Sequence, residues 1–122
     1  MLLTLTNSDE TGQSSIQLYD ARNNPELLET RIDTAMASVA NLYGRSAVGV
    51  LLTGMGEDGR DGMRAIADSG GSTIAQNEET SIVFDMPSSA IDAGTAHEVL
   101  PLWSIADHVN TIVSRGANAN AA

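Results

Sequence analysis

The residues best suited to chemistry lie in one glycine-rich segment, GMGEDG, at residues 54–59. The segment follows the apolar run AVGVLL and precedes a stretch with helical spacing, so it connects a predicted buried strand to a predicted helix. In open α/β sheets, functional sites form at the carboxyl ends of the strands. An acid such as Asp58 in that bend can orient a histidine and stabilise its cationic form, as in a Ser-His-Asp arrangement.

Two other chemistries and one purely structural role compete for the same segment. GMGEDG matches the dinucleotide-binding pattern G-x-G-x-x-G, and Glu78 and Glu79 follow at roughly the distance of a ribose-binding acid. Against this, Glu57 and Asp58 would place negative charge beside a pyrophosphate. Glu57, Asp58 and Asp61 could bind Mg²⁺ or Ca²⁺, although their spacing does not fit the calcium loop. In the structural interpretation, the glycines form a turn and Asp58 caps a helix.

A nucleophile and a base that could work with Asp58 are not evident. The pattern G-x-S-x-G, which places a serine on a sharp strand-to-helix turn, does not occur in the chain. The residues weighed as substitutes all follow Asp58 in the sequence: Ser81, Ser88, Ser89, His97 and His108. We expect the two histidines to lie at surface or helix-end positions, outside any catalytic arrangement.

Composition limits the class of protein. A chain of 122 residues with 42% hydrophobic residues can form one small domain with a real core. It contains no cysteine, which excludes disulfides, thiolate chemistry and cysteine-based zinc sites. A net charge of -10 disfavours nucleic acid and anionic lipid as partners. No apolar run reaches the roughly 18 residues of a membrane span, and the first residues do not form a secretory signal. We therefore expect no membrane insertion and a cytoplasmic location.

The first third of the chain predicts a hairpin and a helix. Residues 1–6 and 15–19 have strand patterns, with a polar turn over residues 7–13 between them. Asn24 and Pro25 are typical of a helix start, and apolar residues at steps of three and four continue the pattern as far as Gly44.

The remaining residues alternate between short apolar strands and helices. Strands are predicted over residues 47–52, 72–75 and 98–100, and helices over about 63–68 and 103–113. Residues 78–93 predict short helical pieces interrupted at Met86-Pro87. The alternation is typical of an α/β layered fold with a mostly parallel sheet, in one domain.

Three blocks beyond the glycine-rich segment resemble a known family. The runs AVGVLLTGMGEDGRDGMRAI, TIAQNEETSIVFDMP and AIDAGTAHEVLPL occur in this order, and the likeness to the CheB-type protein-glutamate methylesterase domain extends from about Ile32 to Val109. A weaker likeness includes MLLTL at the N-terminus. The resemblance implies a doubly wound, Rossmann-like α/β domain, truncated at its N-terminal side and preceded by a hairpin. Residues 1–114 would be the C-terminal portion of that domain, and residues 115–122 a frayed tail.

The same resemblance implies an activity and assigns residues to it. The family hydrolyses glutamate methyl esters on chemoreceptors with a Ser-His-Asp triad and needs no cofactor. Asp58 matches the triad aspartate, and Met55 matches the residue whose backbone N–H helps to bind the oxyanion. Gln76, Asn77, Glu78 and Thr80 match a block whose side chains we expect to support the site through hydrogen bonds to the backbone. The implied partners are methylated chemoreceptor glutamates and either the missing N-terminal half or a receiver domain.

The chain departs from the family pattern in ways that bear on activity. The family's serine and histidine lie upstream of the segments present here, so we expect the chain alone to be inactive, marginally stable and prone to self-association. Asp85 replaces a usual glycine, and Thr30-Arg31 replaces a usual Pro-Ser. The alternatives are a non-catalytic remnant that binds a chemotaxis or signalling partner and, less favoured, a small dinucleotide-binding module.

Overall fold

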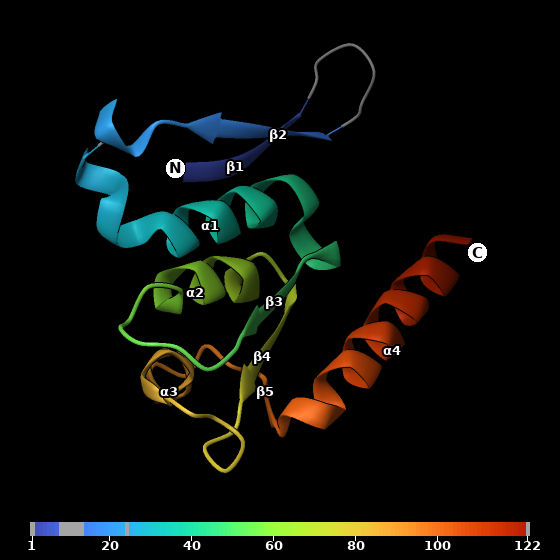
Figure 1. Cartoon of the computed structure of the whole chain (residues 1–122). Coiled ribbons are helices and arrows are strands. Elements are labelled where there is room, and N and C mark those ends of the chain that lie inside the picture. The colour runs from blue at the N-terminus through green and yellow to red at the C-terminus, as the bar shows by residue number, and fades with distance from the viewer. Residues whose placement is uncertain (1, 8–13, 24, 122) are drawn as a thin grey trace.

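A three-stranded parallel sheet forms the centre of the molecule, as the computed structural model shows for residues 2–7, 14–23 and 25–121 (Figure 1). Its strands are β3 (Val48–Leu51), β4 (Ser72–Gln76) and β5 (Glu98–Leu100), in the order β3-β4-β5. The register pairs Val50 with Ile74, and Ile74 with Glu98. All three strands therefore end at the same edge of the sheet, where a site is expected in this fold class.

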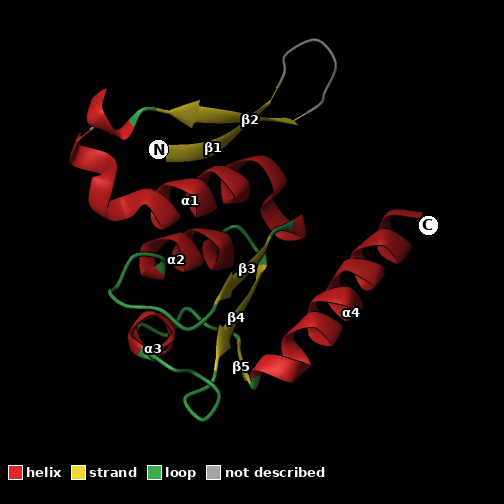
Figure 2. Cartoon of the chain, in the orientation of Figure 1, coloured by secondary structure: helices red, strands yellow, loops and turns green. Residues whose placement is uncertain are grey.

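Helices cover both faces of this sheet. Helix α2 (Arg60–Asp68) connects β3 to β4, and α3 (Asp85–Asp92) connects β4 to β5. Both lie on one face, whereas α4 (Leu102–Ala121) lies along the other (Figures 1 and 2). This arrangement confirms the predicted α/β fold with a parallel sheet.

The apolar core lies between the sheet and the helices α2 and α3. Met63 and Ile66 of α2 and Ile74 of β4 are almost completely buried. Leu51 at the end of β3 packs with Met63 and with Ala90 of α3. These contacts fix the start of the glycine-rich segment, because Leu51 is the last residue of β3.

An outer layer is built on α2. Helix α1 (Arg31–Tyr43) packs against α2, and the hairpin of β1 (Leu2–Asn7) and β2 (Ser14–Tyr19) lies on α1 (Figure 2). Three short 3-10 helices complete the described chain: η1 (Ala21–Asn23), η2 (Pro25–Thr30) and η3 (Gly44–Ser46). The hairpin confirms the prediction for the N-terminus, but Asn7, which was expected in the turn, is the last residue of β1. The rest of the turn predicted over residues 7–13 lies outside the described residues.

Two predicted helix starts are wrong. Residues 25–30 form η2, and the α-helix begins only at Arg31. Helix α2 begins at Arg60, earlier than the predicted Met63. In both cases an aspartate that lies outside the helix binds its first amides, as described below, and sequence pattern alone contains no sign of such a contact.

The C-terminal elements also differ from the prediction. Met86-Pro87 does not interrupt a helix, because Pro87 is the third residue of α3, where a missing N–H leaves no intrahelical bond unmade. Helix α4 continues past the predicted end near Val113 as far as Ala121. The alanines of that tail favour helix even without an apolar pattern. Fraying of residues 115–122 stays a prediction.

Candidate active site

The glycine-rich segment leaves β3 at the carboxyl edge of the sheet and is fastened there by backbone bonds. The Gly54 N–H donates to the Val83 carbonyl at 2.9 Å, and the Met86 N–H donates to the Gly54 carbonyl at 3.1 Å. The Thr53 hydroxyl both donates to the Val83 carbonyl, at 2.9 Å, and accepts from the Val83 N–H, at 2.8 Å. The segment after β3 is thus tied to the segment that leads into α3.

A buried amide, Gln76, supports the same point from the end of β4. Its side chain, which is 1% exposed, accepts the Thr53 N–H at 2.8 Å and donates to the Thr80 carbonyl at 2.7 Å. The Asn77 side chain accepts the Thr80 N–H at 3.1 Å and the Thr80 hydroxyl at 2.7 Å. The side-chain-to-backbone bonds predicted for Gln76 and Asn77 are therefore present.

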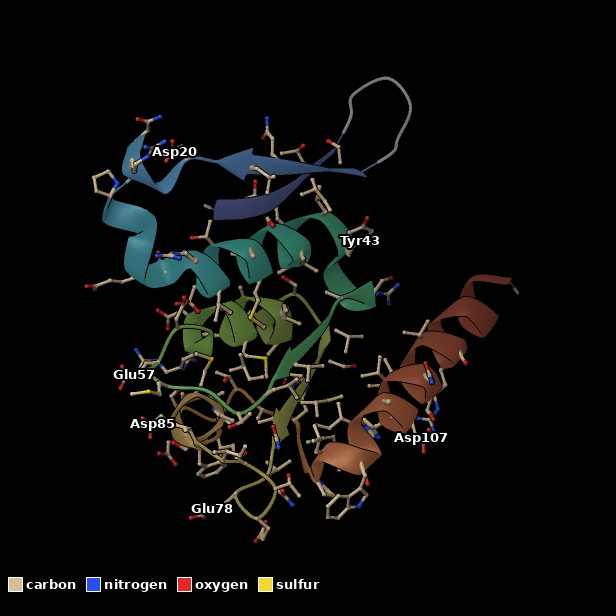
Figure 3. The ribbon with its side chains drawn as sticks, viewed as in Figure 1. Asp20, Tyr43, Glu57, Glu78, Asp85 and Asp107 are labelled. Carbon is tan, nitrogen blue, oxygen red and sulfur yellow. The ribbon has the colours of Figure 1, made fainter. Side chains whose placement is uncertain are left out.

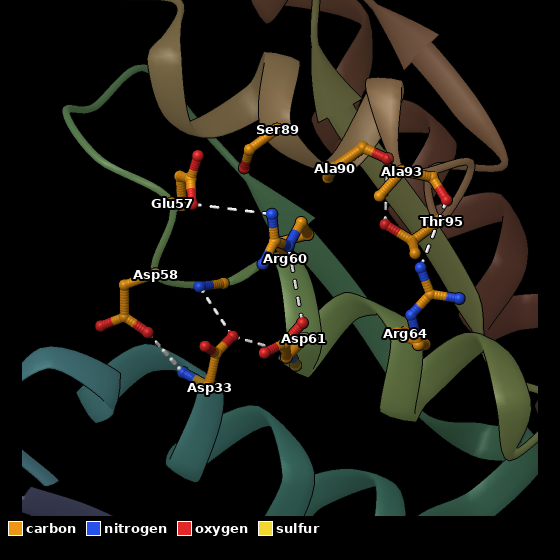
Figure 4. Close-up of polar contacts among 12 residues, drawn as sticks. Asp33, Glu57, Asp58, Arg60, Asp61, Arg64, Ser89, Ala90, Ala93 and Thr95 are labelled. Carbon is orange, nitrogen blue, oxygen red and sulfur yellow. Dashed lines mark hydrogen bonds and ion pairs between the residues drawn. The ribbon is translucent and has the colours of Figure 1, made fainter.

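Asp58 lies in the bend between β3 and α2, half-buried, and its carboxylate faces the start of α1 (Figure 4). It accepts the Ile32 N–H at 2.9 Å and the Asp33 N–H at 2.8 Å, one on each oxygen. These are the second and third amides of α1, the groups that an N-terminal cap satisfies. Thr30, the residue at the cap position, makes no such bond with its own side chain. Asp58 is therefore a cap, but on a different helix from the one that follows it.

Asp33 makes the reciprocal contact and was missed by the sequence analysis. Its Oδ1 atom accepts the Gly59 N–H at 2.8 Å and the Gly62 N–H at 2.7 Å, at the start of α2. Gly59, the residue at the cap position of α2, has no side chain to do this. An acid in the first turn of α1 indicates only a favourable interaction with the dipole of that helix. The sequence therefore does not indicate a contact with another helix.

This exchange argues against the dinucleotide interpretation. A pyrophosphate would bind the free amides at the start of α2. Those amides, of Gly59 and Gly62, already bind a carboxylate.

Next to the two aspartates lies an open hollow of about 490 Å³. Five of its eight lining residues are acidic and one is Arg60; the set is Glu29, Thr30, Asp33, Gly56, Glu57, Asp58, Arg60 and Asp61. Arg60 forms ion pairs with Glu57 at 3.6 Å and Asp61 at 3.5 Å (Figure 4). Within the described ranges, no three acidic or histidine side chains are grouped so as to hold a metal ion.

Two residues singled out by their sequence positions, Met55 and Asp85, are exposed at the surface. The side chain of Met55 is 75% exposed, and its N–H has no hydrogen-bond acceptor within the described part of the chain. Asp85 is the first residue of α3 and is exposed on the same side as Glu57 (Figure 3). Every described residue with positive φ is a glycine, so Asp85 imposes no backbone strain.

The serines and histidines after Asp58 form no pair of nucleophile and base. The hydroxyls of Ser81, Ser88 and Ser89 donate to backbone carbonyls three or four residues earlier. His97 is exposed and precedes β5, at the amino end of the sheet, where its Nδ1 accepts the Thr73 N–H at 3.3 Å. His108 is half-buried within α4.

A parallel sheet covered on both faces, with an acid-bearing glycine loop at its carboxyl edge, defines a doubly wound α/β domain. A family model described as CheB methylesterase matches residues 3–109, and the chain belongs to this family. The catalytic domain of the CheB methylesterase of Thermotoga maritima superposes with a TM-score of 0.73 and 31% sequence identity. The match covers 93% of this chain and 57% of that domain.

Curated relatives agree with the family assignment. The protein-glutamate methylesterase/protein-glutamine glutaminase 1 of Carboxydothermus hydrogenoformans is 55% identical over 78 residues, which cover 64% of this chain and 23% of that protein. The protein of the same type from Moorella thermoacetica is 47% identical over 88 residues, or 72% of this chain and 21% of that protein. The chain thus spans less than a quarter of the length of these relatives. No helix of the described segments has the length and apolarity needed to span a bilayer.

Proposed function

We propose that this chain is the aspartate-bearing part of a protein-glutamate methylesterase that hydrolyses glutamate methyl esters on chemoreceptors. One observation carries the proposal: in a member of the CheB methylesterase family, the Asp58 carboxylate is fixed by two amides at the carboxyl edge of the sheet. A carboxylate that must hold a histidine in one orientation needs such fixation.

In this proposal Asp58 accepts a hydrogen bond from the imidazole of a histidine. An ionised carboxylate offers about four acceptor positions, and the Ile32 and Asp33 amides use two of them. The remaining positions can accept an imidazole N–H, which fixes the tautomer and stabilises the imidazolium when the histidine takes the proton of the serine nucleophile.

Met55 supplies the second proposed function, through its backbone. Its N–H lies in the turn between two glycines and is without an acceptor in the described ranges, so it is available to developing negative charge. A backbone amide that is held in place before the reaction stabilises a tetrahedral intermediate without further reorganisation.

We further propose that the 122-residue chain is inactive alone, because an aspartate in this role neither attacks the ester nor moves the proton. Its partners would be methylated chemoreceptor glutamates, a segment that supplies the serine and histidine, and a receiver domain.

A fusion tests the proposal. The part of the Thermotoga maritima domain that lies outside the match would be joined to the N-terminus of this chain, and methanol release from methylated chemoreceptors would be measured. We expect activity in the fusion and none in the chain alone. Asp58→Asn should lower kcat by roughly 10³–10⁴-fold, the loss typical of a triad aspartate replaced by its amide.

Asp107→Asn is the matched control, because this acid is exposed on α4, on the opposite face of the sheet. It should leave kcat unchanged. A fusion whose activity survives Asp58→Asn would disprove the triad assignment. A fusion that binds methylated receptor without turnover would favour the non-catalytic alternative.

A further inference from the structure

The starts of α1 and α2 exchange their caps, and this exchange joins two residues 25 positions apart. Asp58 binds amides of α1, and Asp33, which belongs to α1, binds amides of α2. From this geometry we infer that Asp33 is a positioning residue that fixes the orientation of the Asp58 carboxylate. The inference rests on the proposed role of Asp58 in the reaction.

Asp33 acts on Asp58 from two sides. Its own N–H binds the Asp58 Oδ1 atom at 2.8 Å, which holds the carboxylate group. Its side chain binds the Gly59 N–H at 2.8 Å, and this amide belongs to the peptide bond that directly follows Asp58. One residue therefore fixes both the side chain of Asp58 and the backbone that carries it.

The close contact between α1 and α2 leaves Asp33 little freedom to move. The Asp33 side chain also binds the Gly62 N–H at 2.7 Å, one turn into α2. A side chain at Gly62 would meet the Asp33 backbone, since an ideal Cβ there lies 3.1 Å from the Asp33 Cα atom. The two helices are thus in contact at the residues that exchange bonds, and no water layer separates Asp33 from the segment it holds.

Removing the Asp33 carboxylate should free Asp58 to change its orientation, although Asp58 itself stays chemically unchanged. In Asp33→Ala the Gly59 and Gly62 amides lose their acceptor, and the bend that contains Asp58 can rotate. In Asp33→Asn the amide oxygen can still accept both N–H groups, though more weakly than a charged carboxylate. The two variants therefore form a graded series.

The first measurement uses the 122-residue chain and needs no activity. Protection of the Ile32 and residue-33 amides from hydrogen exchange, followed by NMR, is the signal that reports their bonds to Asp58. We expect this signal in the native chain and in Asp33→Asn, and its loss in Asp33→Ala. A signal that persists in Asp33→Ala would overturn the inference, because Asp58 would then be held without Asp33.

The second measurement uses the fusion protein. We expect Asp33→Ala to lower kcat by about 10–100-fold at nearly constant KM, since a misplacement of about 1 Å can cost that much. Asp33→Asn should restore most of the loss. Thr73→Val is the matched control, because it removes two hydrogen bonds at the amino end of the sheet and should lower stability without changing kcat.

The outcomes separate the inference from the proposed function. Loss of the NMR signal with unchanged kcat in Asp33→Ala, while Asp58→Asn is inactive, would overturn the role of Asp33 in the reaction. Unchanged kcat in both Asp33→Ala and Asp58→Asn would instead overturn the role of Asp58. If Asp33→Ala does not fold, Asp33→Asn decides: a several-fold loss of kcat at constant KM supports the inference, and wild-type kcat contradicts it.

Discussion

Individual glycines determine how close the two capping aspartates come to each other. Gly59 has φ of +116°, a conformation that side chains rarely adopt, and a Cβ there would lie 2.6 Å from Leu51. At Gly62 a Cβ would lie 2.6 Å from the Met36 Cβ atom. Gly59, the last glycine of the G-x-G-x-x-G pattern, therefore permits a close approach to β3, and Gly62, which lies outside that pattern, brings α2 into contact with α1.

Gly62→Ala tests this contact. We expect the free energy of unfolding to fall by about 1–3 kcal/mol, the usual cost of forcing extra volume into a filled contact. Urea unfolding followed by circular dichroism measures the change. Gly116→Ala in α4 is the control, because nothing lies within 4 Å of a Cβ at that position, and it should gain about 0.5–1 kcal/mol. Equal stability of Gly62→Ala and the native chain would rule out the close approach.

Between elements, the loops that follow β3 and β4 depend on each other through Gln76. This side chain ends β4 and binds the backbone on both sides of the site, at Thr53 and at Thr80. Thr80 in turn accepts the Leu102 N–H at the start of α4, at 3.1 Å. The ends of all three strands are thus connected through one buried amide and one hydroxyl.

Gln76→Met keeps the side-chain volume but removes the hydrogen bonds to the Thr53 N–H and to the carbonyl and hydroxyl of Thr80. We expect a loss of about 1–3 kcal/mol, because the Thr53 N–H and the Thr80 carbonyl lose their partners. Amide hydrogen exchange at Thr53 and Gly54 should become faster, while exchange in α2 should change little. Thr111→Val, on the exposed side of α4, removes one comparable side-chain bond and serves as the control. Unchanged exchange at Gly54 in Gln76→Met would contradict the coupling.

Most of the strands, loops and helices can be predicted from the sequence, and the parts that cannot be predicted share one cause. The strand before GMGEDG and the position of Asp58 follow from local pattern: an apolar run, a glycine loop and helical spacing. The starts of α1 and α2 do not, because α1 is fixed by Asp58 from the loop before α2, and α2 is fixed by Asp33 of α1. The sequence predicts a break at Pro87. The prediction is wrong because α3 begins at Asp85, which places Pro87 in its first turn, and the local pattern does not indicate that start.

For the molecule as a whole, the sheet is open at β3. In the part of the chain that the structure describes, β3 pairs with β4 alone, and its sequence is the apolar VGVL. The matched Thermotoga maritima domain is longer, since the chain covers 57% of it. An unpaired apolar edge of this kind is prone to pair with another strand.

We expect the isolated chain to associate as its concentration rises, which sedimentation velocity can measure. Val48→Lys, at the start of β3, should weaken the association, because a charge on an edge strand opposes pairing. Val113→Lys, on the exposed surface of α4, should leave it unchanged. A chain that stays monomeric at all concentrations would refute this prediction. Equal effects of the two variants would show that the contact between chains does not involve β3.

The exchanged caps also impose an order on folding. Neither α1 nor α2 satisfies its first amides with a side chain from its own cap residue, and the bonds that do so connect residues 25 to 29 positions apart. A nascent helix needs only nearby contacts, whereas these bonds form only after the two helices have met. We therefore expect Asp58 to reach its final orientation only once α1 and α2 are in contact. A folding intermediate that precedes that step would contain the sheet and the helices, but its Asp58 carboxylate would not yet have the final orientation.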